Sequence, residues 1–271
     1  MKKYFRPWLR ILLVGAVLFV AAEQALRHTG NPNFFPTTVL LGASIVPVAF
    51  VAFFYDYVRH REISLPLLTT CAVAGGALGL LAAGVVQYEA LGEARTLTLV
   101  VVSLSEEAAK LLFPLIMFIG WKYRHEADGL LFGIAAGMGF AALETMGYGL
   151  TTFLRSGGDI DVVQRVLLIR GFLSPAGHAA WTGFLCAILW RERERAGHVS
   201  INWKVLLAYL VVVALHTFWN MVNTMGAETT AEVTGVVAAN AAIAAVSLTL
   251  IILRYRSARR SLRLYPSHVD G

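Results

Sequence analysis

The sequence predicts an all-α, polytopic membrane bundle of about eight transmembrane helices that form a single domain, residues 1–271. Apolar residues make up 57% of the chain and charged residues only 15%, whereas a soluble domain is about one-quarter charged. The apolar residues also come in runs of roughly 20, the length that crosses a bilayer. No soluble domain, repeat or low-complexity linker separates these runs. The expected spans are Trp8–Ala25, Val39–Val58, Leu65–Val86, Leu97–Trp121, Gly129–Phe153, Phe172–Trp190, Val205–Thr224 and Thr234–Leu253.

The basic residues predict the orientation of these spans. Most of the 23 lysines and arginines lie in the terminal segments and in alternate loops. Since positively charged segments stay in the cytoplasm, we expect both termini there and a multi-pass protein of the cytoplasmic membrane. These charges are spread unevenly and follow the expected orientation of the spans, so they give no indication of nucleic-acid binding. The first span also resembles a signal peptide, but its long apolar core and weak Val20-Ala21-Ala22 site favour a retained helix.

The first three spans offer little chemistry. Glu23 lies near the outer end of the first span, where we expect it to reach the interface. The third span is rich in glycine and alanine, which suits close helix packing in lipid. Cys71 and Cys186 both fall inside spans, so we expect buried packing thiols and no disulfide.

The span Leu97–Trp121 contains Glu106, Glu107 and Lys110. A charge at the centre of a transmembrane helix costs about 2.5–3.5 kcal/mol. Lys110 can pair with either glutamate, because they precede it by four and three positions on a helix. The other carboxylate then needs a proton, a metal ion or a histidine from another helix. Pro114 is expected to kink this span and to free a backbone carbonyl near the acids.

The fifth span carries a further acid, Glu144, behind a run of small residues that lets a neighbouring helix come close. Glu144 and Tyr148 are four positions apart and share one helix face. The following outer loop, Arg155–Gly171, is expected to form an interfacial helix, a lid or a rest for substrate.

Two histidines lie on the next two spans, His178 near the start of the sixth and His216 on the seventh. Asn220 lies one turn after His216 and points the same way. At 1.5 Å per residue, these histidines and the glutamates of the fourth and fifth spans lie roughly 9–15 Å below the outer surface. We therefore expect them to meet in one buried layer, as ionisable groups within bundles commonly do.

Such a layer of glutamates and histidines favours hydrolysis of an amide bond. It can hold Zn²⁺ and activate a water molecule. It can also act without metal, when a glutamate takes the proton and His and Asn side chains stabilise the oxyanion. The alternative is a proton- or cation-coupled transporter, since buried Glu, Lys and His chains also relay protons. No repeat relates the two halves of the chain, as many transporters would require. A non-catalytic protein that binds a partner helix is a third interpretation.

The polar residues form ordered motifs on successive spans within residues 97–224. This set resembles the PrsW family of intramembrane proteases, which is similar to the larger group of CAAX prenyl endopeptidases and bacteriocin-immunity proteins. Thr145 departs from the pattern, because the family leads us to expect Asn after the second-motif glutamate. The motifs are Glu106-Glu107-x-x-Lys110, Phe140-x-x-x-Glu144 with Tyr148, His178, and His216-x-x-Trp219-Asn220.

The resemblance implies a membrane peptidase, of the metalloprotease or glutamate type, that cleaves a single-span membrane protein such as an anti-sigma factor near the outer face. Its partners would be that substrate and the lipid bilayer, with no nucleic acid and no nucleotide or organic cofactor. We expect Glu107 to be the free base and Glu106 to be the partner of Lys110. The implied catalytic residues are Glu106, Glu107, Glu144, His178, His216 and Asn220, with Lys110 and Tyr148 in support and His178, His216 and Glu144 as ligands of Zn²⁺ if a metal is used.

Overall fold

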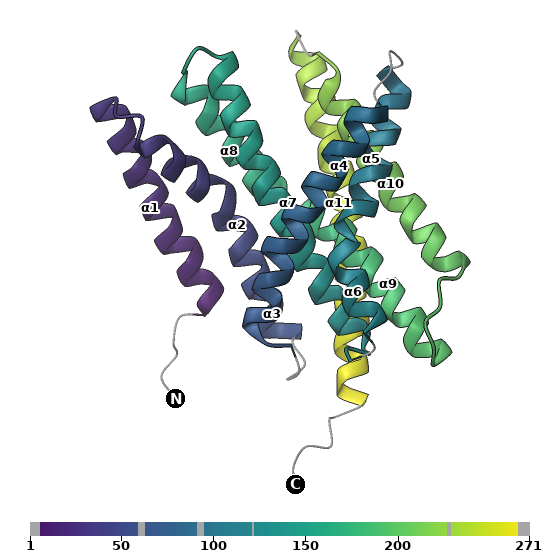
Figure 1. Ribbon diagram of the computed structural model, residues 1–271. Helices are drawn as coiled ribbons and strands as arrows, with labels where there is room; N and C mark the ends of the chain where they lie inside the picture. The colour runs from purple at the N-terminus through teal and green to yellow at the C-terminus, as the bar shows by residue number, and fades with distance from the viewer. Residues whose placement is uncertain (1–5, 59–62, 91–94, 121, 227–228, 265–271) are drawn as a thin grey trace.

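The computed structural model describes residues 6–58, 63–90, 95–120, 122–226 and 229–264, which form helices and no strand (Figure 1). Trp121, the expected end of the fourth span, lies outside the described residues. The helices are α1 (Pro7–Thr29), α2 (Phe34–Val58), α3 (Leu65–Thr70), η1 (Cys71–Gly75), α4 (Gly76–Ala90), α5 (Arg95–Lys110), α6 (Leu112–Ile119), α7 (Glu126–Arg155), α8 (Ile160–Leu173), η2 (Pro175–Ala179), α9 (Ala180–Ala196), α10 (Trp203–Thr224) and α11 (Thr230–Leu264).

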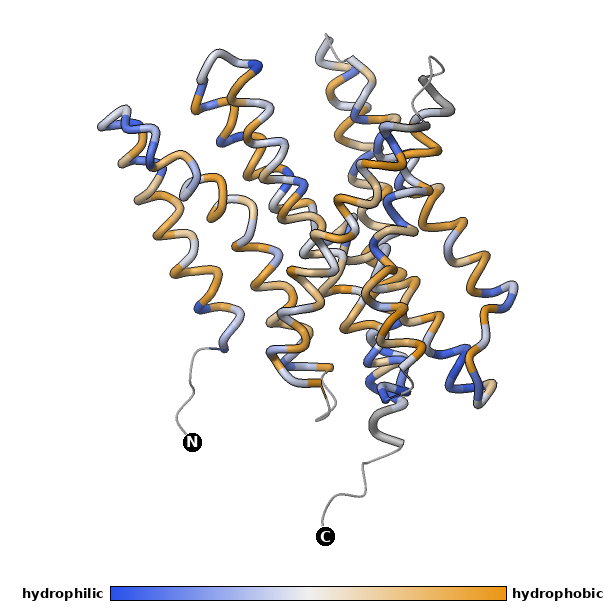
Figure 2. The backbone as a smooth tube through the Cα atoms, viewed as in Figure 1, coloured by the Kyte–Doolittle hydropathy of each residue, from blue (hydrophilic) through white to orange (hydrophobic). Residues whose placement is uncertain are grey.

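Among the described residues, seven helical stretches are long and apolar enough to cross a membrane. This confirms a polytopic helical bundle, and Figure 2 shows hydrophilic residues gathered at helix ends and loops around largely apolar helices. The stretches are Pro7–Thr29, Phe34–Val58, Leu65–Tyr88, Glu126–Arg155, Ile160–Ala196, Trp203–Thr224 and Thr230–Ser261.

The remaining expected span is not one helix but two, α5 and α6, which are separated at Leu111. The expected effect of Pro114 explains the break, because proline has no N–H to donate to the carbonyl of Lys110. The backbone adjusts with a tighter turn, in which the N–H of Leu111 donates to the carbonyl of Ala108 at 3.1 Å. The acidic motif therefore ends directly at a helix break.

Helix α7 is the centre of the bundle, and a stripe of glycines brings α9 against it. A Cβ on Gly133 would lie 2.5 Å from the carbonyl oxygen of Thr182, and one on Gly137 would lie 2.4 Å from that of His178. Any larger side chain would push the two helices apart, as expected for small residues at membrane helix interfaces. The stripe thus fixes the distance between α7 and the turn that carries His178.

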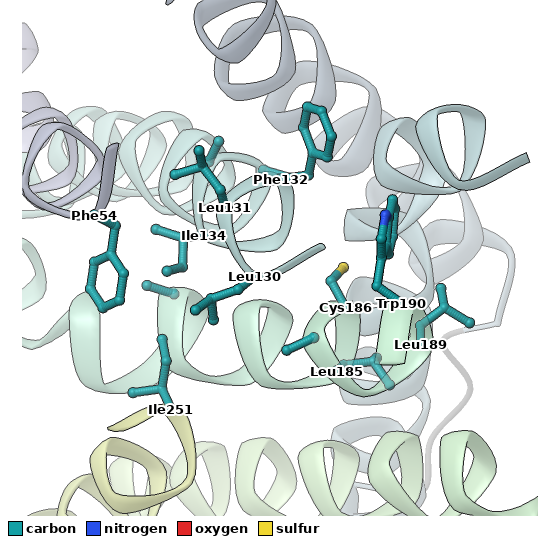
Figure 3. Close-up of a cluster of buried hydrophobic side chains, with 14 of the residues drawn as sticks. Phe54, Leu130, Leu131, Phe132, Ile134, Leu185, Cys186, Leu189, Trp190 and Ile251 are labelled. Carbon is teal, nitrogen blue, oxygen red and sulfur yellow. The ribbon is translucent and has the colours of Figure 1, made fainter. Parts of the chain in front are cut away.

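The apolar core fills the half of the bundle on the side of the chain termini. Leu130 and Ile134 of α7 pack against Leu185 and Trp190 of α9, with neighbouring side chains from α2 and α11 (Figure 3). Cys71 and Cys186 are buried and free, as expected.

The expected outer loop, Arg155–Gly171, is mostly helix α8, which continues through the π-helical turn η2 into α9. Asp159 caps this helix, and its side chain accepts hydrogen bonds from the N–H groups of Asp161 and Val162. Val163 and Leu167 of α8 pack against α1 and α2, so α8 is an integral helix of the bundle.

Glu23 is also buried, which differs from the expectation that it reaches the interface. It pairs with Arg27, whose Nη2 contacts the Asp161 Oδ1 of α8 at 2.6 Å. A buried carboxylate with a cationic partner one turn away needs no access to water.

Candidate active site

Ionisable side chains from five helical elements meet in one buried cluster above the apolar core. The helix break at Leu111, the π-helical turn η2 and the close packing at glycines of α7 all help to position them. Each determines where one of the contributing helices passes α7. The cluster consists of Glu106, Glu107 and Lys110 of α5, Glu144 of α7, His178 of η2, His216 of α10 and Arg170 of α8.

Glu107 is the glutamate that holds Lys110. Their Oε1 and Nζ atoms lie 2.6 Å apart, and both side chains have no exposed surface. Glu106 was the expected partner, but its Oε2 lies 3.7 Å from the Lys110 Nζ. Glu107 Oε1 also lies 2.8 Å from the Nδ1 of His216, which leaves the Nε2 of that imidazole toward Glu106.

Glu106 is held more loosely than Glu107 and is 7% exposed. Gln87 of α4 donates from Nε2 to its Oε1 at 3.2 Å. Its other oxygen, Oε2, is buried without a hydrogen-bond partner and lies 3.7 Å from the Nε2 of His216. A carboxylate oxygen in this state has lone pairs available for a water molecule or a cation.

Glu144 forms the second half of the cluster together with His178 and Arg170. Its Oε2 lies 2.7 Å from the Nη2 of Arg170 and 3.3 Å from the Nε2 of His178. The Nδ1 of His178 is buried without a hydrogen-bond partner. Arg170 was not among the predicted site residues, because its position in the sequence indicated a loop at the membrane surface.

Aromatic rings line the cluster. Trp181 stacks on His216, with ring centroids 4.8 Å apart, and its indole N–H donates to the Ser247 Oγ at 2.8 Å. The Nζ of Lys110 lies 4.4 Å from the ring centroid of Phe140, a favourable position for a cation. Trp181 was also missed, because a tryptophan three residues after His178 is indistinguishable from ordinary packing by sequence.

Two of the predicted site residues, Tyr148 and Asn220, are held less tightly than the cluster. Tyr148 is 46% exposed, and its ring lies 3.8 Å from the guanidinium of Arg170. Asn220 is half-buried and, within the described part of the chain, has no hydrogen bond to His216. Thr145, which follows Glu144 and stands where we expected Asn, is buried.

A cavity of about 450 Å³ opens onto the cluster between α4 and α7. Glu106 and Glu144 line it, whereas Glu107, Lys110 and the two histidines do not. Its other lining residues are Leu80, Ala83, Gly84, Gln87, Phe140, Leu143, Gly147, Tyr148, Thr151 and Arg155.

The donor types of this cluster fit a zinc ion, which takes imidazole nitrogens and carboxylate oxygens. Glu106 Oε2 and His178 Nδ1 are buried polar atoms that lack a partner. His216 also has the arrangement common to zinc ligands, in which a carboxylate orients one nitrogen and leaves the other for the metal. In the described ranges, no three His, Cys, Asp or Glu side chains are already gathered around a metal position. Binding would therefore require side-chain movement.

Comparison with known proteins gives one match. The family model described as PrsW family intramembrane metalloprotease matches residues 35–251, from α2 to α11. This region is wider than the motif-bearing residues 97–224. Because the matched family consists of proteases, the match favours a peptidase over a transporter. Searches of curated proteins and of solved structures gave no match. The chain therefore belongs to the PrsW family of intramembrane metalloproteases and is a multi-pass membrane peptidase.

Proposed function

We propose that this peptidase hydrolyses a peptide bond of a single-span membrane protein, with Glu106 as the base that activates water. One observation carries the proposal. Glu106 lines a cavity, and its carboxylate has a buried oxygen without a hydrogen-bond partner that lies 3.7 Å from the Nε2 of His216. A water molecule in the cavity would be within reach of the Glu106 carboxylate as a base. Exclusion of bulk solvent would strengthen electrostatic effects on the reaction.

Glu107 then has a positioning role. It neutralises Lys110 and orients His216 through Nδ1, so that the His216 Nε2 is directed toward Glu106. This reverses the roles expected from the sequence. Both contacts of Glu107 are to its Oε1, and its Oε2 is buried without a hydrogen-bond partner, as is that of Glu106. Glu107 does not line the cavity, however, and its close lysine and histidine favour the charged form over a further proton.

The other side of the cluster supplies groups for the carbonyl of the substrate. Glu144 is fixed by Arg170 and in turn fixes His178. Asn220 lies one turn beyond His216 and can donate to an oxyanion. Together these groups would stabilise the negative charge that develops on the carbonyl oxygen during attack by water.

A bound Zn²⁺ would polarise the substrate carbonyl and make the water more acidic. His216, together with His178 and Glu144 on the facing side, would hold it, which leaves Glu106 as the base beside it. The chain's own residues act the same way in either case: Glu106 receives the proton, Glu107 holds Lys110 and His216, and Arg170 holds Glu144.

The expected cleavage position is near the outer face of a bacterial cytoplasmic membrane. The cavity follows the C-terminal half of α7 toward Arg155, and this end is outward if both termini are cytoplasmic, as the basic residues predict. A single-span regulator such as an anti-sigma factor is the substrate class that the family resemblance implies.

Cleavage of a single-span reporter by the purified protein in proteoliposomes tests this proposal. The wild type should cleave it, Glu106→Gln should not, and Glu232→Gln on distant α11 should match the wild type. Retained cleavage by Glu106→Gln would remove Glu106 from the mechanism. Proton or cation flux that depends on Glu144, without any cleavage, would instead support a transporter.

A further inference from the structure

Helices α4 and α7 touch at one level and separate at the next. A Cβ on Gly76 would lie 2.4 Å from the carbonyl carbon of Gly139, so the two backbones are in direct contact there. Two turns further along the same helices, a Cβ on Gly84 or on Gly147 would meet no described neighbour within 4 Å. In Figure 1, α4 also lies apart from α8, the helix that follows α7 and packs against it, in the upper half of the bundle.

The space between them is the cavity of about 450 Å³, and its character changes along its length. The closed end is apolar, with Leu80 of α4 and Leu143 of α7. The open end is polar, with Gln87, Thr151 and Arg155. Glu106 and Glu144 also line the cavity, and Gln87 donates a hydrogen bond to Glu106 at 3.2 Å.

A peptide bond can be attacked only where the substrate helix is unwound. Unwinding within a membrane leaves backbone N–H and C=O groups without partners, at a cost of several kcal/mol each. The groove offers such partners. The Gln87 side chain uses one N–H for Glu106, which leaves its carbonyl oxygen, and the Thr151 hydroxyl donates to the Tyr148 carbonyl while its oxygen can still accept. A wholly apolar groove would suit a lipid chain better.

The open end also carries a charge without a counter-charge. Arg155 is exposed and has no ion pair among the described residues. Its neighbours on this side differ, because Arg170 pairs with Glu144 and Arg27 pairs with Glu23 and Asp161. Arg155 is therefore available to an acidic side chain of a bound partner.

We propose that the groove between α4 and α7 binds the unwound segment of a single-span substrate, and that Arg155 selects an acidic side chain on its outer flank. This inference rests on the proposed proteolytic function. Glu144 and Arg155 are eleven positions apart, which is about 16 Å along a helix. An extended chain covers that distance in about five residues. The acidic residue is thus expected about five positions outward of the cleaved bond.

Cysteine crosslinking tests the groove without any need for turnover. In a Glu106→Gln background, Gly147→Cys should crosslink to a reporter with one cysteine near its cleavage position. Gly235→Cys on α11 is the matched control, because it also meets no described neighbour within 4 Å but lies outside the groove. Equal crosslinking at both positions, or none at Gly147 when the wild type cleaves the same reporter, would overturn the proposed groove.

A charge exchange tests Arg155. Arg155→Glu should lower kcat/KM by about fivefold for a reporter with Asp five residues outward and raise it for one with Lys, the range expected of an exposed ion pair. Arg165→Glu, an exposed arginine of α8 away from the groove, should change neither. Unchanged preference in Arg155→Glu would refute the selection. Crosslinking at Gly147 without cleavage by the wild type would leave the groove standing and refute the proteolytic function.

Discussion

The unequal holding of the two adjacent glutamates leads to a prediction that separates stability from catalysis. Glu107→Gln removes the close partner of Lys110, and both side chains are fully buried. Loss of one partner of a buried ion pair costs about 3–5 kcal/mol, because the other charge remains in a low dielectric. Glu106 Oε2, 3.7 Å from the Lys110 Nζ, can compensate in part. We therefore expect a loss near the lower limit, about 3 kcal/mol.

Glu106→Gln should behave in the opposite way. Its carboxylate makes one hydrogen bond, from Gln87, and its ionic distances are longer. The loss of one such bond is worth about 1 kcal/mol, whereas removal of a general base lowers the rate by about 10²–10⁴-fold.

The two effects can be measured on the same preparations. Thermal unfolding in detergent should give a melting temperature about 6–12 °C lower for Glu107→Gln, by the scaling for domains of this size. Single-turnover cleavage should fall for Glu106→Gln at nearly wild-type melting temperature. If Glu107→Gln were as stable as the wild type, or Glu106→Gln as active, the assignment of their roles would be wrong.

Three further predictions follow from individual contacts. Arg170→Gln should lower kcat by at least tenfold through misplacement of Glu144, and Arg170→Lys should restore part of it in the same cleavage assay, since a lysine keeps the charge but not the guanidinium geometry. If zinc is used, metal analysis of purified protein should give about one ion per chain, and His216→Ala should lose it; full activity of metal-free protein would contradict a metal mechanism. Gly139→Ala should lower the melting temperature by several degrees, because its Cβ would lie 1.7 Å from the carbonyl oxygen of Ala72, and overpacking of this kind costs about 1–3 kcal/mol.

Much of the fold was predictable because membrane helices are specified by length and hydrophobicity. The break at Leu111 was also predictable, since Pro114 removes a specific hydrogen bond. The helix within Arg155–Gly171 was harder to predict, because the charged residues of this segment are typical of a solvent-exposed loop. In the structure, two of these charges pair with residues of other helices, Arg170 with Glu144 and Asp161 with Arg27.

The depth of the ionisable residues within their spans predicted which of them lie together. It did not predict which of them form ion pairs. Spacings of three and four residues both allow a lysine to reach a glutamate. The choice between Glu106 and Glu107 is made by His216, which arrives from α10 and shares the Oε1 of Glu107. The sequence of the fourth span alone does not predict which glutamate pairs with Lys110, because this choice depends on the packing of α10 beside α5.

The cluster also explains why one carboxylate must remain reactive. Three carboxylates, those of Glu106, Glu107 and Glu144, face two permanent cations, Lys110 and Arg170. The two closest ion pairs satisfy Glu107 and Glu144, so the excess negative charge belongs to Glu106. A buried charge in excess is costly unless a proton, a cation or an oriented dipole compensates it. The excess negative charge that makes Glu106 able to accept a proton from water would therefore also attract a metal ion to the cluster, so both mechanisms begin from the same missing counter-charge.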